Sequence, residues 1–199
     1  MATGDVTVKR VLLYLLKDFS RMHTITTMAK ELGLSRVGMW KVIKKLDGEK
    51  YVVLKTIGGG KTSASLINLN WENSLLEKAL SLHLTEEALK LRRWQVNFAE
   101  LENVTNFVIL YGSILKSSQR ANDVDILGIA PRGNFVKIHQ VIDNVQKTQS
   151  KEIHSLNFTK DEFKTELKKP NKAFVDAIKK GVILFGQDKF VQFMREMLR

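Results

Sequence analysis

Two short apolar runs separated by a polar spacer constrain the fold of this chain more than any other feature of its sequence. The first run is residues 107–111, and the second, residues 122–127, carries Asp123 and Asp125 one residue apart. Side chains at i and i+2 of a strand point to the same face, so the two aspartates should project together while their apolar neighbours enter a core. Adjacent carboxylates repel unless they share a cation, and oxygen ligands suit Mg²⁺. The pattern predicts neighbouring strands with a magnesium site.

The segment that follows the first run has the composition of a phosphate-binding turn. Gly112 and Ser113 stand where a strand should give way to a helix. A glycine lets a phosphate approach the backbone, and a helix N-terminus presents free N–H groups to it. Ser113 adds a hydroxyl donor, and Lys116 is a basic group within reach of the same place. We therefore expect Gly112, Ser113 and Lys116 to bind phosphate, with a solvated helix surface as the alternative for Lys116.

In these residues the chain resembles the nucleotidyltransferase superfamily of DNA polymerase beta, most closely its minimal nucleotidyltransferases, over about residues 103–186. The mark of the family is Gly-Ser at the start of a helix, followed by Asp-x-Asp on the next strand. The resemblance implies that Asp123 and Asp125 bind the metal ions of the nucleotide and that Gly112 and Ser113 hold its phosphates.

The resemblance also implies a third catalytic carboxylate on a later strand. Residues 151–158 read as that strand, and they offer Glu152, with His154 on the same face. We take Asp123, Asp125 and Glu152 as the catalytic candidates. Without a third carboxylate near the aspartates, two-metal phosphoryl transfer would be incomplete, although nucleotide binding could remain.

Composition limits the chemistry that this chain can perform. It has 199 residues and no cysteine, which excludes disulfides, thiol catalysis and cysteine-based zinc sites. The net charge is +11 and is unevenly spread. Residues 1–70 hold 12 Lys and Arg against 5 Asp and Glu, a balance of +7, and residues 71–199 hold 20 against 16, a balance of +4. The basic first third is typical of a domain that binds nucleic acid.

Residues 1–70 show a helix-turn-helix pattern followed by a hairpin. Apolar spacing predicts a helix over about residues 5–18, a second helix capped by Thr24 and ending at Leu32, and a third capped by Ser35 and reaching about residue 48. Gly33 suits the sharp turn between the last two helices. Residues 51–57 and 62–69 predict two strands around a glycine-rich tip. This arrangement resembles winged-helix DNA-binding domains, and the resemblance implies that the third helix enters the major groove of double-stranded DNA.

The outward face of that third helix supplies most of the candidate DNA-binding residues. Arginine can read guanine, whereas lysines mostly neutralise phosphates. Trp40 has two interpretations, contact with DNA or packing against the wing or a partner. The alternative function of the whole domain is protein contact or dimerisation. The candidates are Ser35, Arg36, Val37, Trp40, Lys41, Lys44, Lys45 and, on the wing, Lys61.

Residues 71–102 read as a helical connector of two stretches, 71–82 and 85–101, with Thr85 as the N-cap of the second. The second stretch carries apolar side chains on more than one face, which favours burial between domains or subunits. Winged-helix regulators usually act as dimers, so we expect a homodimer with this connector as its candidate element. The alternative is core packing within the following domain.

Residues 103–199 complete the chain with alternating strands and helices. We expect a helix over 135–149, a capping box of Thr159 and Glu162 before the next helix, a short strand near 182–185 and a last helix over 187–198. The fold class is α+β: a winged helix (1–70), a helical connector (71–102) and a nucleotidyltransferase-like small mixed sheet with helices (103–199).

The expected function is that of a DNA-binding transcription regulator whose second domain binds Mg²⁺ and a nucleoside triphosphate. The alternative is an active nucleotidyltransferase that transfers a nucleoside monophosphate to a protein or other hydroxyl acceptor, with antitoxin-like action as one version. A non-enzymatic nucleotide sensor or dimer scaffold is a further version. No apolar run could span a bilayer and the N-terminus lacks a signal-peptide pattern, so we expect no membrane association and a cytoplasmic location.

Overall fold

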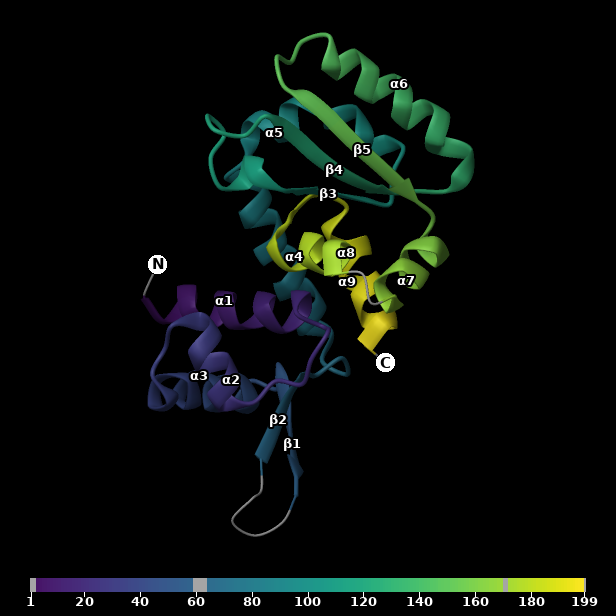
Figure 1. Cartoon of the computed structure of the whole chain (residues 1–199). Coiled ribbons are helices and arrows are strands. Elements are labelled where there is room, and N and C mark those ends of the chain that lie inside the picture. Colours follow the sequence, from purple (N-terminus) through teal and green to yellow (C-terminus); the bar gives the residue numbers. More distant parts are fainter. Residues whose placement is uncertain (1–2, 59–63, 170–171, 199) are drawn as a thin grey trace. The chain divides into compact units, whose positions relative to one another are not determined.

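The computed structural model describes residues 3–58, 64–169 and 172–198 (Figure 1). The described residues mix helices with small sheets, which confirms the α+β class. The chain divides into two compact units, Met1–Leu80 and Ser81–Arg199, and the division falls within α4 (Ser74–Leu89), inside the predicted connector. Among the described residues, no helix combines the length and the apolar character that crossing a membrane requires.

Three helices begin the first unit, close to the predicted bounds: α1 (Thr3–Lys17), α2 (Ile25–Leu32) and α3 (Arg36–Gly48). The Thr24 hydroxyl caps α2 by accepting from the backbone N–H of Thr27, as predicted. Gly33 ends α2 with φ 66°, in the left-handed region that residues with a side chain rarely adopt. The turn between α2 and α3 thus follows from local sequence.

The predicted hairpin is also present. β1 (Val52–Ile57) pairs antiparallel with β2 (Ala64–Leu69). The backbone N–H of Ile67 donates to the carbonyl oxygen of His23 (2.9 Å), so the segment before α2 joins the edge of this hairpin. A shared core holds the helices and the hairpin together; its fully buried members include Leu12, Leu16, Met28, Met39, Ile43, Leu46, Val52 and Ile67.

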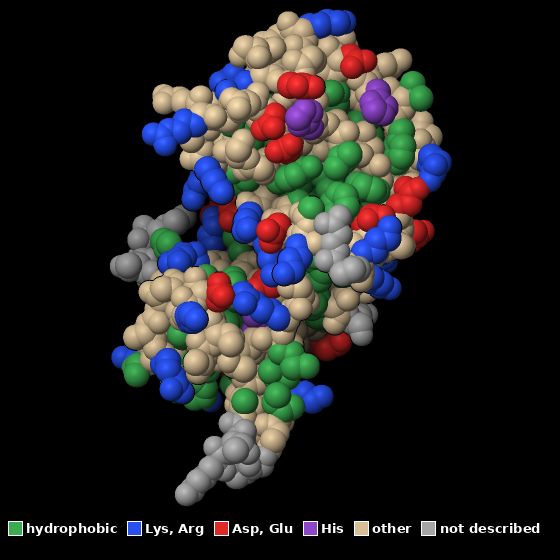
Figure 2. Space-filling model, in the orientation of Figure 1, with side chains coloured by type: hydrophobic (Ala, Val, Ile, Leu, Met, Phe, Trp, Pro, Cys, Tyr) green, Lys and Arg blue, Asp and Glu red, His purple; other side chains and the backbone are tan. Residues whose placement is uncertain are grey.

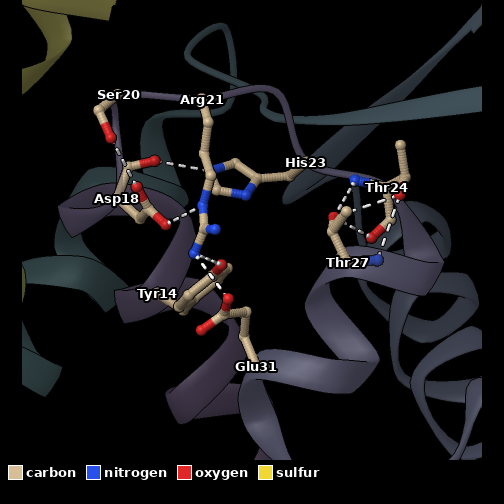
Figure 3. A network of polar contacts seen from close by, with 8 residues as sticks. All are labelled: Tyr14, Asp18, Ser20, Arg21, His23, Thr24, Thr27 and Glu31. Atoms are coloured by element: carbon tan, nitrogen blue, oxygen red, sulfur yellow. Dashed lines mark hydrogen bonds and ion pairs between the residues drawn. The ribbon is translucent and has the colours of Figure 1, made fainter.

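A polar network fixes the loop between α1 and α2 (Figure 3). Asp18 is only 3% exposed, and its carboxylate accepts from Arg21 Nε at 2.7 Å. Arg21 also donates to the Tyr14 hydroxyl (3.0 Å) and pairs with Glu31 (3.2 Å), while His23 Nε2 lies 2.6 Å from the Asp18 carbonyl oxygen. Burial, reinforced by the Asp18 carboxylate, raises the pKa of Tyr14 to about 12. The network ties α1 to α2 through Arg21, which contacts Tyr14 on the first helix and Glu31 on the second.

The second unit is built on a four-stranded mixed sheet of order β5-β4-β3-β6. β3 (Phe107–Tyr111) runs antiparallel to both β4 (Asp123–Ile129) and β6 (Val182–Phe185), whereas β4 and β5 (Glu152–Phe158) are parallel. The strands match those predicted from the apolar runs, and the sheet is small and mixed, as expected for residues 103–199.

Helices cover both faces of this sheet (Figure 1). On one face, side chains of α5 (Arg92–Asn97) and α6 (Phe135–Gln146) share a buried cluster with alternate residues of the strands, among them Val124 and Ile126. On the other face, rings of α7 and α9 pack on one another and on Phe107, next to Phe174 of α8. The helices of this second layer are α7 (Lys160–Lys168), α8 (Lys172–Lys180) and α9 (Gln187–Leu198). Thr159 and Glu162 form the predicted capping box of α7.

The connector differs from its prediction. α4 runs unbroken through Thr85, so Thr85 is not an N-cap. Its hydroxyl instead donates to the carbonyl oxygen of Ser81 (2.9 Å), one turn earlier, which satisfies a threonine inside a helix. The predicted second helix is interrupted twice. The first break is at Lys90 and Leu91, between α4 and α5, and the second is at Phe98, where α5 has ended and the 3₁₀ segment η2 (Ala99–Asn103) follows.

Candidate functional site

Helix α3 presents a basic face that is free of acidic side chains over its first three turns. Met39, Ile43 and Leu46 are completely buried and fix the inner side of the helix. The helical period then directs the remaining side chains outward, and Arg36, Val37, Trp40, Lys41, Lys44 and Lys45 are all exposed. The first acidic residue of α3, Asp47, stands near its C-terminal end. In the part of the chain that the structure describes, Arg36 and Lys41 form no ion pair.

Trp40 lies within this basic face. It is 41% exposed, and Lys44 Nζ lies 4.8 Å from the centroid of its ring. A cation over an aromatic ring is held loosely, by about 0.5–1 kcal/mol at an exposed site, so Lys44 keeps its charge available to a ligand. Trp40 therefore does not pack into the core of its own unit, and its flat ring is available to a sugar, a base or a partner.

Local contacts engage three of the predicted DNA-binding residues, Ser35, Lys44 and Lys45. The Ser35 hydroxyl accepts from the backbone N–H of Gly38 (3.0 Å), so its first role is the predicted N-cap of α3. Lys44 Nζ lies 3.9 Å from Asp47 Oδ2, and Lys45 Nζ lies 3.9 Å from Glu49 Oε1. Ion pairs between exposed groups of this kind add little stability in water. Lys61, predicted on the wing, lies outside the described residues.

A second cluster of functional side chains lies on the sheet of the other unit. Asp123 and Asp125 of β4 point to the face opposite Val124 and Ile126, as strand alternation predicts. His154 on the parallel strand β5 stands opposite Asp125, and its Nδ1 lies 3.6 Å from Asp125 Oδ1 and 3.8 Å from Asp123 Oδ2. Each of the three residues offers one ligand atom, and these atoms all lie within 4.8 Å of one another. Figure 2 shows acidic side chains gathered round a histidine on this unit.

The turn after β3 lies directly against both aspartates of this cluster. Gly112 has φ 85° and ψ −159°, and a Cβ built on it would meet Asp125 Oδ2 at 2.0 Å. The missing side chain of Gly112 thus leaves the space that the Asp125 carboxylate occupies. The Ser113 hydroxyl donates to Asp123 Oδ1 (3.2 Å). Gly112 and Ser113 therefore position the two aspartates.

The helix expected after Gly112 is absent. Ser113–Leu115 (η3) forms only a three-residue 3₁₀ turn. Ser117 then accepts a bond from the backbone N–H of Arg120 (3.3 Å), a local contact that competes with helix formation. The prediction of a helix N-terminus aimed at phosphate is therefore wrong for this segment, and Lys116 is exposed beside it.

The electrostatics of the cluster favour binding of a cation. Burial raises the pKa of Asp125, the neighbouring Asp123 carboxylate raises it further, and the His154 imidazole lowers it. Burial also raises the pKa of Tyr111, which pairs with Asp125 across β3 and β4, and the Asp125 carboxylate adds to this rise. Partly desolvated carboxylates that repel one another gain most when a cation joins them.

Glu152 does not reach the two aspartates. It is paired in register with Asp123, but its side chain is 78% exposed and its Oε1 lies 3.5 Å from His154 Nε2, on the far side of the imidazole. Among the described residues, the third member of the cluster is His154 and not Glu152. The sequence placed both residues on one face, and the register sets each of them opposite an aspartate. The outward direction of the Glu152 side chain leaves His154 as the third member of the cluster.

The ligand set bears on which metal ion would fit. Two carboxylates suit Mg²⁺, whereas an imidazole nitrogen suits Mn²⁺, Zn²⁺ or another transition metal. Asp123 and Asp125 alone would serve Mg²⁺ with water or phosphate completing its shell. With His154 included, the set fits a divalent transition metal.

Comparison of the chain with known proteins gives no matching family model, no matching curated protein and no matching solved structure.

Proposed function

We propose that this chain binds double-stranded DNA through the exposed face of α3 and acts as a transcription regulator. The observation that carries the proposal is the composition of that face. Arg36, Lys41, Lys44 and Lys45 are exposed on the same helix as the exposed ring of Trp40, with no acidic residue between positions 36 and 45. Most contacts between proteins and DNA go to phosphates, which such a face can neutralise.

The surrounding fold supports the same reading. Gly33 and the caps at Thr24 and Ser35 hold α3 in a fixed relation to α2, and the buried side of α3 anchors it against the unit's core. A rigid helix with an outward basic face is the element that helix-turn-helix proteins place in the major groove. Lys55 on β1 adds an exposed positive charge on the hairpin.

The test uses fluorescence anisotropy with a labelled duplex of mixed sequence. Lys41→Ala removes one charge from the face without touching the core, and we expect weaker binding with a salt slope smaller by about 1. Lys137→Ala is the matched control, because Lys137 is an exposed lysine on α6 of the other unit. Equal affinity of the two variants would contradict the proposal.

A second candidate function rests on the Asp123, Asp125 and His154 cluster. We propose that it binds a divalent metal together with a nucleoside triphosphate. A bound metal would supply the positive charge that a triphosphate requires. Asp123 and Asp125 would hold it, Ser113 would keep Asp123 oriented through its hydrogen bond, and the open backbone at Gly112 would preserve the position of Asp125.

Whether transfer of a nucleoside monophosphate follows depends on a group that activates the acceptor hydroxyl. Glu152, the candidate that the sequence offers, lies outside the cluster of Asp123, Asp125 and His154, which favours a sensor or scaffold over an enzyme. His154 is the described group closest to that role, since its imidazole lies beside both carboxylates. Transfer to a hydroxyl acceptor, with or without an antitoxin-like role, remains the alternative.

Calorimetric titration tests this second candidate. ATP and GTP are each added with Mg²⁺ or Mn²⁺ to the native protein, to Asp125→Asn and to Asp143→Asn. Asp143 is an exposed aspartate on α6 and serves as the control. Binding that is lost in Asp125→Asn and kept in Asp143→Asn would support the site. Absence of binding to the native protein would contradict it.

A further inference from the structure

Helix α4 is apolar on two opposite sides, and only one of them is buried. Residues at four-residue spacing, Leu76, Leu80, Leu84 and Ala88, are completely buried. The other side carries Leu75, Leu82 and Leu89, which we call the leucine stripe, and these are 63%, 58% and 60% exposed. Three large apolar side chains in line on an exposed helix are costly in water unless a partner covers them.

We infer that a second copy of this chain covers the leucine stripe, with the two α4 helices antiparallel about a two-fold axis at Leu82. The stripe repeats every seven residues, the spacing at which one helix keeps a seam against another along several turns. A two-fold axis at Leu82 brings Leu82 against its own copy. It also places Leu75 opposite Leu89 of the other copy, so each leucine of the stripe meets a leucine.

Charge selects the antiparallel direction over the parallel one. In the antiparallel pair, residues whose numbers are symmetric about 82 lie at the same level. Lys78 then faces Glu86 of the other copy, and this opposite-charge pair occurs twice. In a parallel pair, Lys78 would face Lys78 and Glu86 would face Glu86, which places like charges together at both levels.

The side chains next to the stripe permit close approach. Ala79 and Thr85 are small, and the same symmetry brings Ala79 of one copy to the level of Thr85 of the other. Packed helices lie about 8–10 Å apart, at the shorter end where small side chains meet. This dimer is independent of DNA binding, so either proposal can fail without the other.

The first experiment is sedimentation velocity of the full chain. We expect the native protein to be a dimer and Leu82→Glu to be a monomer, because the substitution places two carboxylates at the axis. Val136→Glu is the control, since Val136 is 68% exposed on α6 and lies outside the stripe. A native protein that stays monomeric at its highest soluble concentration overturns the inference, as does a dimer that survives Leu82→Glu.

The second experiment uses the absence of cysteine from the chain. Under oxidation, Leu82→Cys should form a covalent dimer by itself, and Leu75→Cys should not. A mixture of Leu75→Cys and Leu89→Cys should crosslink, because these positions face one another in the antiparallel pair. Val136→Cys is the control that should remain monomeric. Self-crosslinking of Leu75→Cys would show a parallel pair and overturn the assignment.

A charge exchange tests the pairing of Lys78 with Glu86. Lys78→Glu should weaken the dimer, and adding Glu86→Lys should restore it, because the exchange keeps opposite charges facing each other. In a parallel pair the single change would leave like charges opposed, as before, and would alter little. Failure of the double variant to recover the dimer would overturn the pairing.

Discussion

Replacement of Gly112 by alanine tests the geometry of the carboxylate cluster. The backbone of Gly112 has φ 85° and ψ −159°, a region that is essentially restricted to glycine. Holding another residue there costs about 1–3 kcal/mol. In addition, the new Cβ would lie 2.0 Å from Asp125 Oδ2 and 3.0 Å from Asp125 Cγ, so the carboxylate must move. Overpacking of this kind costs about 1–3 kcal/mol more.

Substitutions at two other glycines separate the cost of the backbone conformation from the cost of overpacking. Gly33 has φ 66° but no atom within 4 Å of its would-be Cβ, so Gly33→Ala should cost only the backbone term, about 1–2 kcal/mol. Gly133 has neither a positive φ nor a near neighbour, so Gly133→Ala should change stability by no more than about 0.5 kcal/mol. We expect the loss of unfolding free energy to increase from Gly133→Ala to Gly33→Ala to Gly112→Ala, and to reach about 2–6 kcal/mol for Gly112→Ala.

Urea unfolding gives the free energies, and amide hydrogen exchange identifies the unit that is affected. Gly112→Ala should reduce protection in β3 and β4 and leave α2 unchanged, whereas Gly33→Ala should do the reverse. If Gly112→Ala were as stable as Gly133→Ala, the conformation described for Gly112 and its contact with Asp125 would be refuted.

Two further predictions concern the caps and the carboxylates. Thr24→Ala should destabilise the first unit by about 1 kcal/mol in urea unfolding, since the cap of α2 is lost, while Thr26→Ala, an exposed position in the same helix, should not. The pKa of Asp125 is raised in the folded state, so its contribution to stability is present at acid pH and declines as pH rises through that pKa. With chelator present, Asp125→Asn should therefore melt above the native protein at neutral pH and lose this advantage in acid; a constant difference in melting temperature across pH would contradict it.

Local signals were enough to predict most of the first unit. Thr24, Gly33 and Ser35 act on their own neighbours through caps and a left-handed turn, so their roles could be read without tertiary information. The core side of α3 followed from apolar spacing for the same reason.

Predictions from the sequence failed where a non-local or competing interaction determined the local structure. Thr85 followed by two glutamates has the composition of a helix start, but burial of Leu84 and Ala88 continues α4 through it. Ser117, in the spacer after Gly112, makes a local hydrogen bond that competes with the expected helix. His154 enters the carboxylate cluster through the register of two parallel strands, which no local pattern specifies.

The most direct test of the central claim is the salt dependence of DNA binding by the native protein and by Lys41→Ala/Lys44→Ala/Lys45→Ala. All three lysines are exposed on α3, so the triple variant should fold. The control Lys137→Ala/Lys147→Ala/Lys168→Ala, on α6, at the C-cap of α6 and on α7, carries the same change of charge. If the α3 face contacts phosphates, the slope of log K against log salt should fall by about 2–3 in the first variant and stay unchanged in the second. Equal slopes in both variants, or no binding by the native protein, would contradict DNA binding through α3.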